Sequence, residues 1–265
     1  SELPAGFNLM TNMRKLKIVN SGLERMPKGI DTAFTNMYDF RVSESMLNSF
    51  DVDVQKWQHL VHLDLIGNRL KRIHDNVWSH PNLMNLYLDD NFRLEIPSIE
   101  KVTVSLPNLQ SFFFNNNGAN IPRDVFTSKN FPILLLLYLS GNVMVTLPDS
   151  FESLKKRVAY LGFARTGLTK LPTYLNDFSR LAYIDLRDNN ITSVDSDLST
   201  MISRNQITAY FSGNDVCQTP SAKFLDCVPL CSKFCWNRNH KNNNFCDHTC
   251  NSALCEFDSG ECSSN

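Results

Sequence analysis

The chain has 265 residues, of which 42% are hydrophobic, and its formal net charge at pH 7 is −1. This length and apolar content suffice for one elongated domain with a continuous core and one small additional module. A nearly neutral chain gives no indication of a nucleic-acid partner. The sequence also lacks any run of 18 or more apolar residues of the kind that predicts a membrane-spanning helix.

A motif recurs along the first four fifths of the chain. Its clearest copy, residues 60–73, has leucine or isoleucine at positions 1, 4, 6, 11 and 14 and an asparagine, Asn68, at position 9. Eight further copies begin at Met13, Met37, Leu83, Leu109, Leu134, Val158, Leu181 and Gln206. The pattern resembles that of leucine-rich repeat proteins, whose repeats are about 20–29 residues long. The resemblance implies an α/β solenoid, a horseshoe with a parallel sheet on its concave side.

The residue types agree with that fold. In residues 60–65 apolar and polar side chains alternate, which predicts a short strand with Leu63 and Leu65 inward and His62 and Asp64 outward. One such unit cannot bury its apolar side alone, so stacked copies build the core. Asn68, with a donor and an acceptor, is expected to bond main-chain groups of the next coil. Position 9 of the other copies holds Ser21, Ser45, Asn91, Asn117, Asn142, Thr166, Asn189 and Asn214. A leucine-rich helical protein, the alternative, would need a 3.6-residue period and no such column.

The beginning of the chain matches the second half of a repeat whose strand is missing, because Leu3, Pro4 and Phe7 follow the later pattern. We therefore expect the sequence to be a fragment of a longer polypeptide. A natural mature terminus with an irregular first coil is the alternative.

The outward strand positions are candidates for binding. Aromatic residues concentrate there in the middle and later repeats, namely Tyr87, Phe113, Tyr138, Tyr160 and Tyr183. An exposed aromatic cluster is typical of a protein-binding hot spot, and neighbouring rings that stack along a sheet also stabilise a fold. Both interpretations stay open at this point.

The earlier repeats carry charge on the same face. Basic residues come first, namely Arg14, Lys15, Lys17 and Arg41. Acidic residues follow, namely Asp39, Glu44, Asp64, Asp89 and Asp90. Such a gradient orients a charged partner, or it is ordinary solvated surface.

Motifs for catalysis are lacking. The sequence has no nucleophile elbow, no paired metal-binding histidines and no phosphate-binding loop, so we do not expect an enzyme. Asn190, Ile191 and Thr192 form one N-glycosylation sequon at an expected exposed corner, which makes Asn190 a candidate glycan carrier.

Cysteine placement divides the chain. Residues 1–216 contain none, and all eight lie between Cys217 and Cys262. A disulfide framework in an oxidising compartment explains this pattern; a cytosolic zinc site is less consistent with the spacings. We expect a solenoid of about nine repeats over residues 1–216. A cap over residues 217–230 would be closed by a disulfide between Cys217 and Cys227, and a third segment covers residues 231–262.

The third segment ends FCDHTCNSALCEFDSGEC and resembles the Notch-type repeat, or LNR. The resemblance implies three disulfides, Cys231–Cys255, Cys235–Cys250 and Cys246–Cys262. It also implies one bound Ca²⁺, and hard oxygen ligands are available for it. The candidate ligands are Asn243, Asp258 and Glu261, with Asp247 as a weaker candidate. A disulfide-linked module without a bound ion is the alternative.

Two classes of function follow. The first is an extracellular or cell-surface recognition module, part of an ectodomain, that binds a protein or peptide on its concave face without catalysis. The second is a structural subunit whose solenoid docks with neighbouring subunits of an extracellular or cell-surface assembly.

Overall fold

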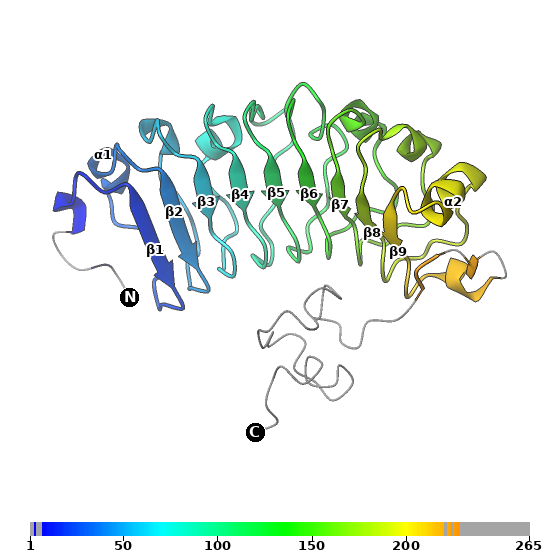
Figure 1. The fold of residues 1–265 in the computed structure, drawn as a ribbon. Coiled ribbons are helices and arrows are strands. Elements are labelled where there is room, and N and C mark those ends of the chain that lie inside the picture. Colours follow the sequence, from blue (N-terminus) through cyan, green and yellow to red (C-terminus); the bar gives the residue numbers. More distant parts are fainter. Residues whose placement is uncertain (1–2, 4–6, 220–221, 224, 228–265) are drawn as a thin grey trace. The chain divides into compact units, whose positions relative to one another are not determined.

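The computed structural model describes residues 3, 7–219, 222–223 and 225–227. The chain divides into two compact units, residues 1–225 and 226–265. The first unit contains all the helices and strands given below (Figure 1). The cysteines from Cys231 onward and the four candidate calcium ligands lie outside the described residues.

Nine parallel strands form one sheet in which each strand pairs with the next along the chain. The strands are β1 (Lys15–Val19), β2 (Asp39–Ser43), β3 (His62–Asp64), β4 (Asn85–Tyr87), β5 (Ser111–Phe113), β6 (Leu136–Tyr138), β7 (Tyr160–Gly162), β8 (Tyr183–Asp185) and β9 (Thr208–Tyr210). The predicted leucine-rich repeat solenoid with nine strands is confirmed.

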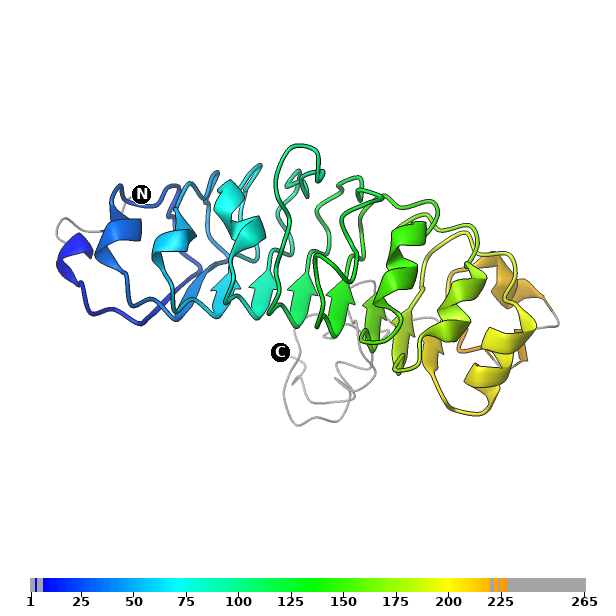
Figure 2. The same cartoon turned by 90° about the horizontal axis from the view of Figure 1, so that it is seen from above.

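Short helical segments lie in six of the connections between strands, and one more precedes β1 and one follows β9. Figure 2 shows these segments on the opposite side of the solenoid from the sheet. They are η1 (Phe7–Leu9), α1 (Ile30–Ala33), η2 (Val54–Lys56), η3 (Asp75–Ser79), η4 (Asp149–Leu154), η5 (Thr173–Asp177), α2 (Ser196–Ser203) and η6 (Asp215–Gln218). Within the described residues, no helix has the length and apolar character that crossing a bilayer requires.

The strand register places equal repeat positions beside one another. Asp64 pairs with Tyr87, Tyr87 with Phe113, and Phe113 with Tyr138. Because successive side chains of a strand point to opposite faces, positions 3, 5 and 7 of every repeat share the outward side of the sheet. We call this surface the sheet face.

The core fills the space between the sheet and the helical segments. Leu60, Leu63 and Leu65 are fully buried, as the repeat pattern predicts. In the middle coils the core is aromatic: the ring of Phe126 lies 5.7 Å from that of Phe112 and 5.4 Å from that of Phe151. These phenylalanines come from both the strands and the return paths, so they link the two sides of each coil and stiffen the sheet above them.

The asparagine column closes the turn after each strand. The residue at position 8 has a positive φ in every repeat, as at Asp90 (55°) and Gly141 (71°). This turn directs the next side chain inward: the Asn68 amide donates to the backbone carbonyls of Val42 (2.7 Å) and Leu65 (2.9 Å). The Asn68 carbonyl accepts from the Leu47 N–H at 3.2 Å.

The direction of this bridge differs from the expectation. Val42 and Leu47 belong to the coil before Asn68, so the asparagine ties its own coil to the preceding one and not to the next. The same direction recurs at Asn142, whose amide donates to the Phe114 carbonyl at 2.7 Å. The reason is that the carbonyl groups left unpaired at each corner belong to the strand just completed and to its predecessor.

Candidate protein-interaction surface

Three rings on adjacent strands form a continuous stack on the sheet face. Tyr87 and Phe113 have ring centroids 5.1 Å apart, and Phe113 and Tyr138 lie 4.6 Å apart at an interplanar angle of 16°. All three occupy position 5, which the register aligns across β4, β5 and β6. Each ring is half-buried because its neighbours cover it. We call these three residues the central stack.

A glycine sets the end of the central stack. Gly162 occupies position 5 of β7, directly beside Tyr138 in the register. A Cβ atom at Gly162 would collide with the Tyr138 ring, with Cε1 and Cγ both at 3.1 Å and Cδ1 closer still. The Tyr138 ring therefore lies across the strand at the place where any side chain would stand.

A second aromatic group follows on the last three strands. Tyr160 and Tyr183 have centroids 6.3 Å apart, and Tyr183 and Tyr210 lie 5.5 Å apart edge to face. Tyr160 is the most open of these residues, at 38% exposed. Tyr210 is absent from the sequence prediction, although the ninth copy starting at Gln206 places it at position 5. We call these three residues the tyrosine group.

A buried ion pair supports the tyrosine group. The guanidinium of Arg187 donates to both carboxylate oxygens of Asp185, at 2.7 and 2.5 Å. The two side chains are only 5% and 6% exposed. The guanidinium also lies over the Tyr210 ring, 5.5 Å from its centroid. Because the two charges are paired, this buried ion pair is electrically neutral, and its two hydrogen bonds hold it in place beside the tyrosine rings.

The surroundings change the acidity of the rings. Burial, followed by the negative charge of Asp185, raises the pKa of the Tyr138 hydroxyl to about 12. Burial also raises the pKa of Tyr183. Both hydroxyls therefore stay protonated in alkaline solution as well as at neutral pH, and each can donate a hydrogen bond beside an apolar ring.

The earlier strands carry charged groups on the sheet face. The Arg41 guanidinium binds the Asp39 carboxylate with contacts of 2.7 and 3.1 Å, in the same residue spacing as Asp185 and Arg187 but at a more exposed place. Burial raises the pKa of Asp64. Burial, with contributions from Asp90 and Asp64, raises the pKa of Asp89 to about 7, against the effect of a 2.5 Å hydrogen bond from the Asn115 N–H.

Comparison with known proteins agrees with this architecture. A family model described as Notch: LNR domain matches residues 228–263. A solved leucine-rich repeat protein from Leptospira interrogans superposes with a TM-score of 0.63 and 18% identity, over 86% of this chain and 62% of that chain. The chain is a leucine-rich repeat protein with a C-terminal Notch LNR domain.

Two curated relatives match this leucine-rich repeat protein at low identity. One is an adenylate cyclase of Schizosaccharomyces pombe, 25% identical over 74% of this chain and 12% of the relative. The other is the transforming growth factor beta activator LRRC33 of Danio rerio, 24% identical over 80% of this chain and 35% of the relative. The chain thus spans well under two thirds of the length of either relative.

The remaining candidate residues fall into two sets. Cys217 and Cys227 are both disulfide-bonded. Asn190 is exposed directly after the buried Asn189, and Thr192 of its sequon is exposed as well.

No cluster of three or more histidine, cysteine, aspartate or glutamate side chains that could hold a metal ion occurs in the part of this leucine-rich repeat protein that the structure describes.

Proposed function

We propose that this leucine-rich repeat protein recognises a protein or peptide through its sheet face, with the central stack at the middle of the contact and the tyrosine group extending it. The function proposed is recognition without catalysis. The observation that carries the proposal is the set of six rings on strands β4 to β9, in mutual contact within two groups and open on one side.

The energetics favour this use. Aromatic side chains contribute a large contact area with few rotatable bonds, and they are enriched among residues that dominate binding energies. The rings are already fixed by stacking against one another at 4.6 to 6.3 Å, so binding would immobilise little that is free beforehand. Ring stacking, the stabilising alternative, is thus present in the structure, and it also prepares the surface for a partner.

The relatives offer limited support. The name of the Danio rerio relative describes activation of a protein growth factor, which is consistent with a protein as the class of partner. Because the chain spans 35% of that relative, the identity of the partner does not follow from the likeness.

A crosslinking experiment tests the proposal. A photoreactive phenylalanine analogue replaces Tyr160 on the sheet face in one variant and Tyr174 on η5 in the control. We expect purified candidate ligands, drawn from secreted and cell-surface proteins, to crosslink through position 160 at equimolar concentration. Crosslinking through position 174 with none through position 160 would contradict the assignment of the sheet face.

One observation favours the second function, that of a subunit in an assembly. Apolar side chains at position 2 of several repeats are exposed at the edge where the strands begin, namely Tyr38 (41%), Met84 (37%) and Leu135 (36%). Exposed apolar side chains along one edge are a feature of association surfaces, and here Val61 and Gln110 lie between the three. Sedimentation equilibrium of the purified chain separates the two functions: a monomer favours the recognition module, whereas a fixed stoichiometric complex favours the subunit.

We also propose that the domain over residues 231–262 binds one Ca²⁺, with ligands Asn243, Asp258 and Glu261 and a weaker contribution from Asp247. Carboxylate and amide oxygens are the donors that calcium prefers, and a segment with few apolar residues needs cross-links or an ion in place of a core. In the full oxidised chain, calcium should increase hydrogen-exchange protection of residues 231–262, and Asp258→Ala should abolish the increase. Equal protection in calcium and in excess chelator would contradict the proposal.

The same features indicate where the protein acts. We propose an extracellular or cell-surface location, with a solenoid over residues 1–216, a cap over residues 217–230 and a glycan on Asn190. The disulfide-bonded state of Cys217 and Cys227 supports an oxidising compartment. Mass spectrometry before and after enzymatic removal of N-glycans tests the glycan.

A further inference from the structure

Two places on the sheet face combine a carboxylate with a tyrosine on the next strand. Asp185 and Tyr210 are register partners on β8 and β9. Asp64 and Tyr87 are register partners on β3 and β4. All four residues occupy position 5 of their repeats, so the fold presents the same pair of groups twice.

The two carboxylates have the same local conformation. The Oδ1 atom of Asp185 accepts from the Arg187 N–H at 3.2 Å. The Oδ1 atom of Asp64 accepts from the Ile66 N–H at 3.1 Å. In both repeats the donor is the residue at position 7, so the same backbone hydrogen bond orients the two side chains.

The later pair shows which group fits beside a carboxylate and a ring in this arrangement. The Arg187 guanidinium donates to both carboxylate oxygens of Asp185, and it lies 5.5 Å from the centroid of the Tyr210 ring. One planar cation thereby contacts both groups. Position 7 after β3 is Ile66, which carries no charge, so the earlier pair receives no cation from its own repeat.

We propose that Asp64 and Tyr87 bind the guanidinium of an arginine side chain of the protein partner. This inference rests on the proposed recognition by the sheet face, and it names one residue type that the partner presents there. The guanidinium pairs with the Asp64 carboxylate and lies against the Tyr87 ring, as Arg187 does at the later pair.

The cation beside Asp64 in the register is already engaged. Arg41 is the register partner of Asp64 on β2, but its guanidinium binds both carboxylate oxygens of Asp39, at 2.7 and 3.1 Å. Lys17 lies one strand further away. Within the described residues Asp64 forms no ion pair, so its charge is left for a cation from outside the chain.

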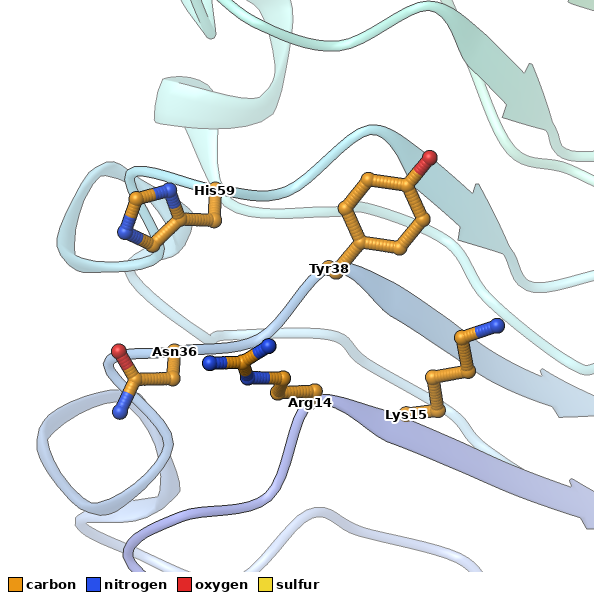
Figure 3. Close-up of a pocket in the computed structure, with 5 residues that line it drawn as sticks. All are labelled: Arg14, Lys15, Asn36, Tyr38 and His59. Carbon is orange, nitrogen blue, oxygen red and sulfur yellow. The ribbon is translucent and has the colours of Figure 1, made fainter.

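The first coil supplies no counterion either. Figure 3 shows the Arg14 guanidinium directed toward Asn36 and the Lys15 ammonium directed away from it. The pocket of about 370 Å³ at this place is lined by Arg14, Lys15, Asn36, Tyr38 and His59. Arg14 precedes β1, whereas Asp64 is the last residue of β3. The two side chains therefore belong to opposite ends of their strands.

One side of the Tyr87 ring is open to a cation. On the side of β5 the ring contacts Phe113, with centroids 5.1 Å apart. On the side of β3 its register partner is Asp64, and among the described residues no aromatic ring contacts Tyr87 there. A guanidinium that approaches from this side meets the ring and the carboxylate together.

A second carboxylate strengthens the attraction. Asp89 lies on the sheet face two residues after Tyr87. Burial raises the pKa of Asp89, and the charge of Asp64 contributes to the rise, so the two carboxylates lie within electrostatic reach of each other. Both attract a cation at this place. Arginine suits it better than lysine because a planar guanidinium both pairs with a carboxylate through two hydrogen bonds and stacks on an aromatic ring.

Titration of the full chain with N-acetyl-arginine methylamide tests the proposal, at pH 8 and low ionic strength. The backbone amide resonances of Ile66 and Tyr87 report binding, and we expect saturable shifts. The citrulline derivative has nearly the same shape without the charge and should bind at least about tenfold more weakly, because it cannot form charge-assisted hydrogen bonds. The lysine derivative should bind at least about threefold more weakly, because it lacks the planar fork.

Three variants locate the site. Asp64→Asn should weaken binding on the order of tenfold, and asparagine keeps an oxygen that can accept from the Ile66 N–H, so this variant should fold. Ile66→Arg supplies a guanidinium at position 7, as in the later pair, and should weaken binding by a similar factor because the site is then filled. Asp75→Asn removes the same charge at an exposed position on η3 and should change the affinity less than about twofold.

Three results would overturn the proposal. The first is no saturable binding of the arginine derivative by the wild-type chain. The second is an equal effect of Asp64→Asn and Asp75→Asn. The third is binding of the citrulline or the lysine derivative as tight as that of the arginine derivative. Each of these results leaves recognition by the sheet face standing, since that proposal fails on crosslinking through position 174 without position 160.

Discussion

The ring of Tyr138 lies across the backbone of Gly162 on the next strand, at the place where a side chain at position 162 would stand. The stack from Tyr87 to Tyr138 ends there because the next strand, β7, has a glycine and no aromatic residue at position 5. The conformation of Tyr138, at the centre of the proposed binding surface, is therefore set by the absence of a Cβ on its neighbour.

Gly162→Ala should displace the Tyr138 ring and destabilise the fold by about 1–3 kcal/mol, the usual cost of overpacking. In a Tyr138→Ala background the added methyl group has room, so the same substitution should be neutral or stabilise by up to about 1 kcal/mol. Denaturant unfolding of the four proteins measures the coupling. An equal effect of Gly162→Ala in both backgrounds would show that the two residues do not interact.

Arg187→Met should destabilise the solenoid by about 3–5 kcal/mol, because it leaves the buried carboxylate of Asp185 without its counterion. Arg41→Met breaks a pair of the same spacing at an exposed position and should cost less than about 1 kcal/mol. The double variant Asp185→Leu, Arg187→Met should recover most of the loss. Thermal unfolding of all three variants gives the comparison, and similar losses for the two single variants would contradict the role of burial.

Asn142→Leu should destabilise the fold by at least about 3 kcal/mol. It removes the partners of the Phe114 and Leu139 carbonyls and of the Ala119 N–H, and each buried group left unpaired costs about 1–3 kcal/mol. Asn48→Leu changes an exposed asparagine outside the asparagine column. Its free energy of unfolding should stay within about 0.5 kcal/mol of the wild-type value. Urea unfolding, followed by circular dichroism, measures the free energy of unfolding of both variants. A small loss for Asn142→Leu would contradict the role of the asparagine column, because it would mean that water can replace the Asn142 hydrogen bonds.

Asp89→Asn should stabilise the solenoid by roughly 1–2 kcal/mol at pH 8 and have little effect at pH 4. The folded state raises the pKa of Asp89 to about 7 from an ordinary value of 3.8, so the folded state binds the proton more tightly than the unfolded state does. The contribution of Asp89 to the free energy of unfolding therefore falls as pH rises from about 4 to about 7, and asparagine lacks this loss. The stabilisation expected for Asp89→Asn is smaller than the full change in pKa would give, because the Asp89 side chain is only half-buried. A difference between variant and wild type that does not change with pH would contradict the raised pKa.

The sequence determines the fold and the columns of the sheet face because both follow from position within the repeat. The register pairs Lys17 with Arg41 and Asp64 with Tyr87 as the repeat alignment predicts. The aromatic residues predicted for the sheet face end at Tyr183, although the copy that begins at Gln206 places Tyr210 at position 5 of the last strand.

Other features depend on distances between coils, which the repeat pattern does not contain. The spacing of Asp185 and Arg187 predicts that they share a face. It does not predict that both are buried or that the Arg187 guanidinium lies over the ring of Tyr210 on the next strand. The predicted direction of the asparagine bridges is wrong because the direction depends on which coil has unpaired carbonyl groups.

The affinity of a partner identified by crosslinking, compared between Tyr138→Ala and Phe92→Ala, tests the central claim most directly. Phe92 is 68% exposed at position 10, outside the sheet face, and is the matched control. We predict that Tyr138→Ala weakens binding at least about tenfold and that Phe92→Ala changes it less than about twofold. An affinity of Tyr138→Ala within about 0.5 kcal/mol of wild type would contradict the assignment of the central stack as the binding surface.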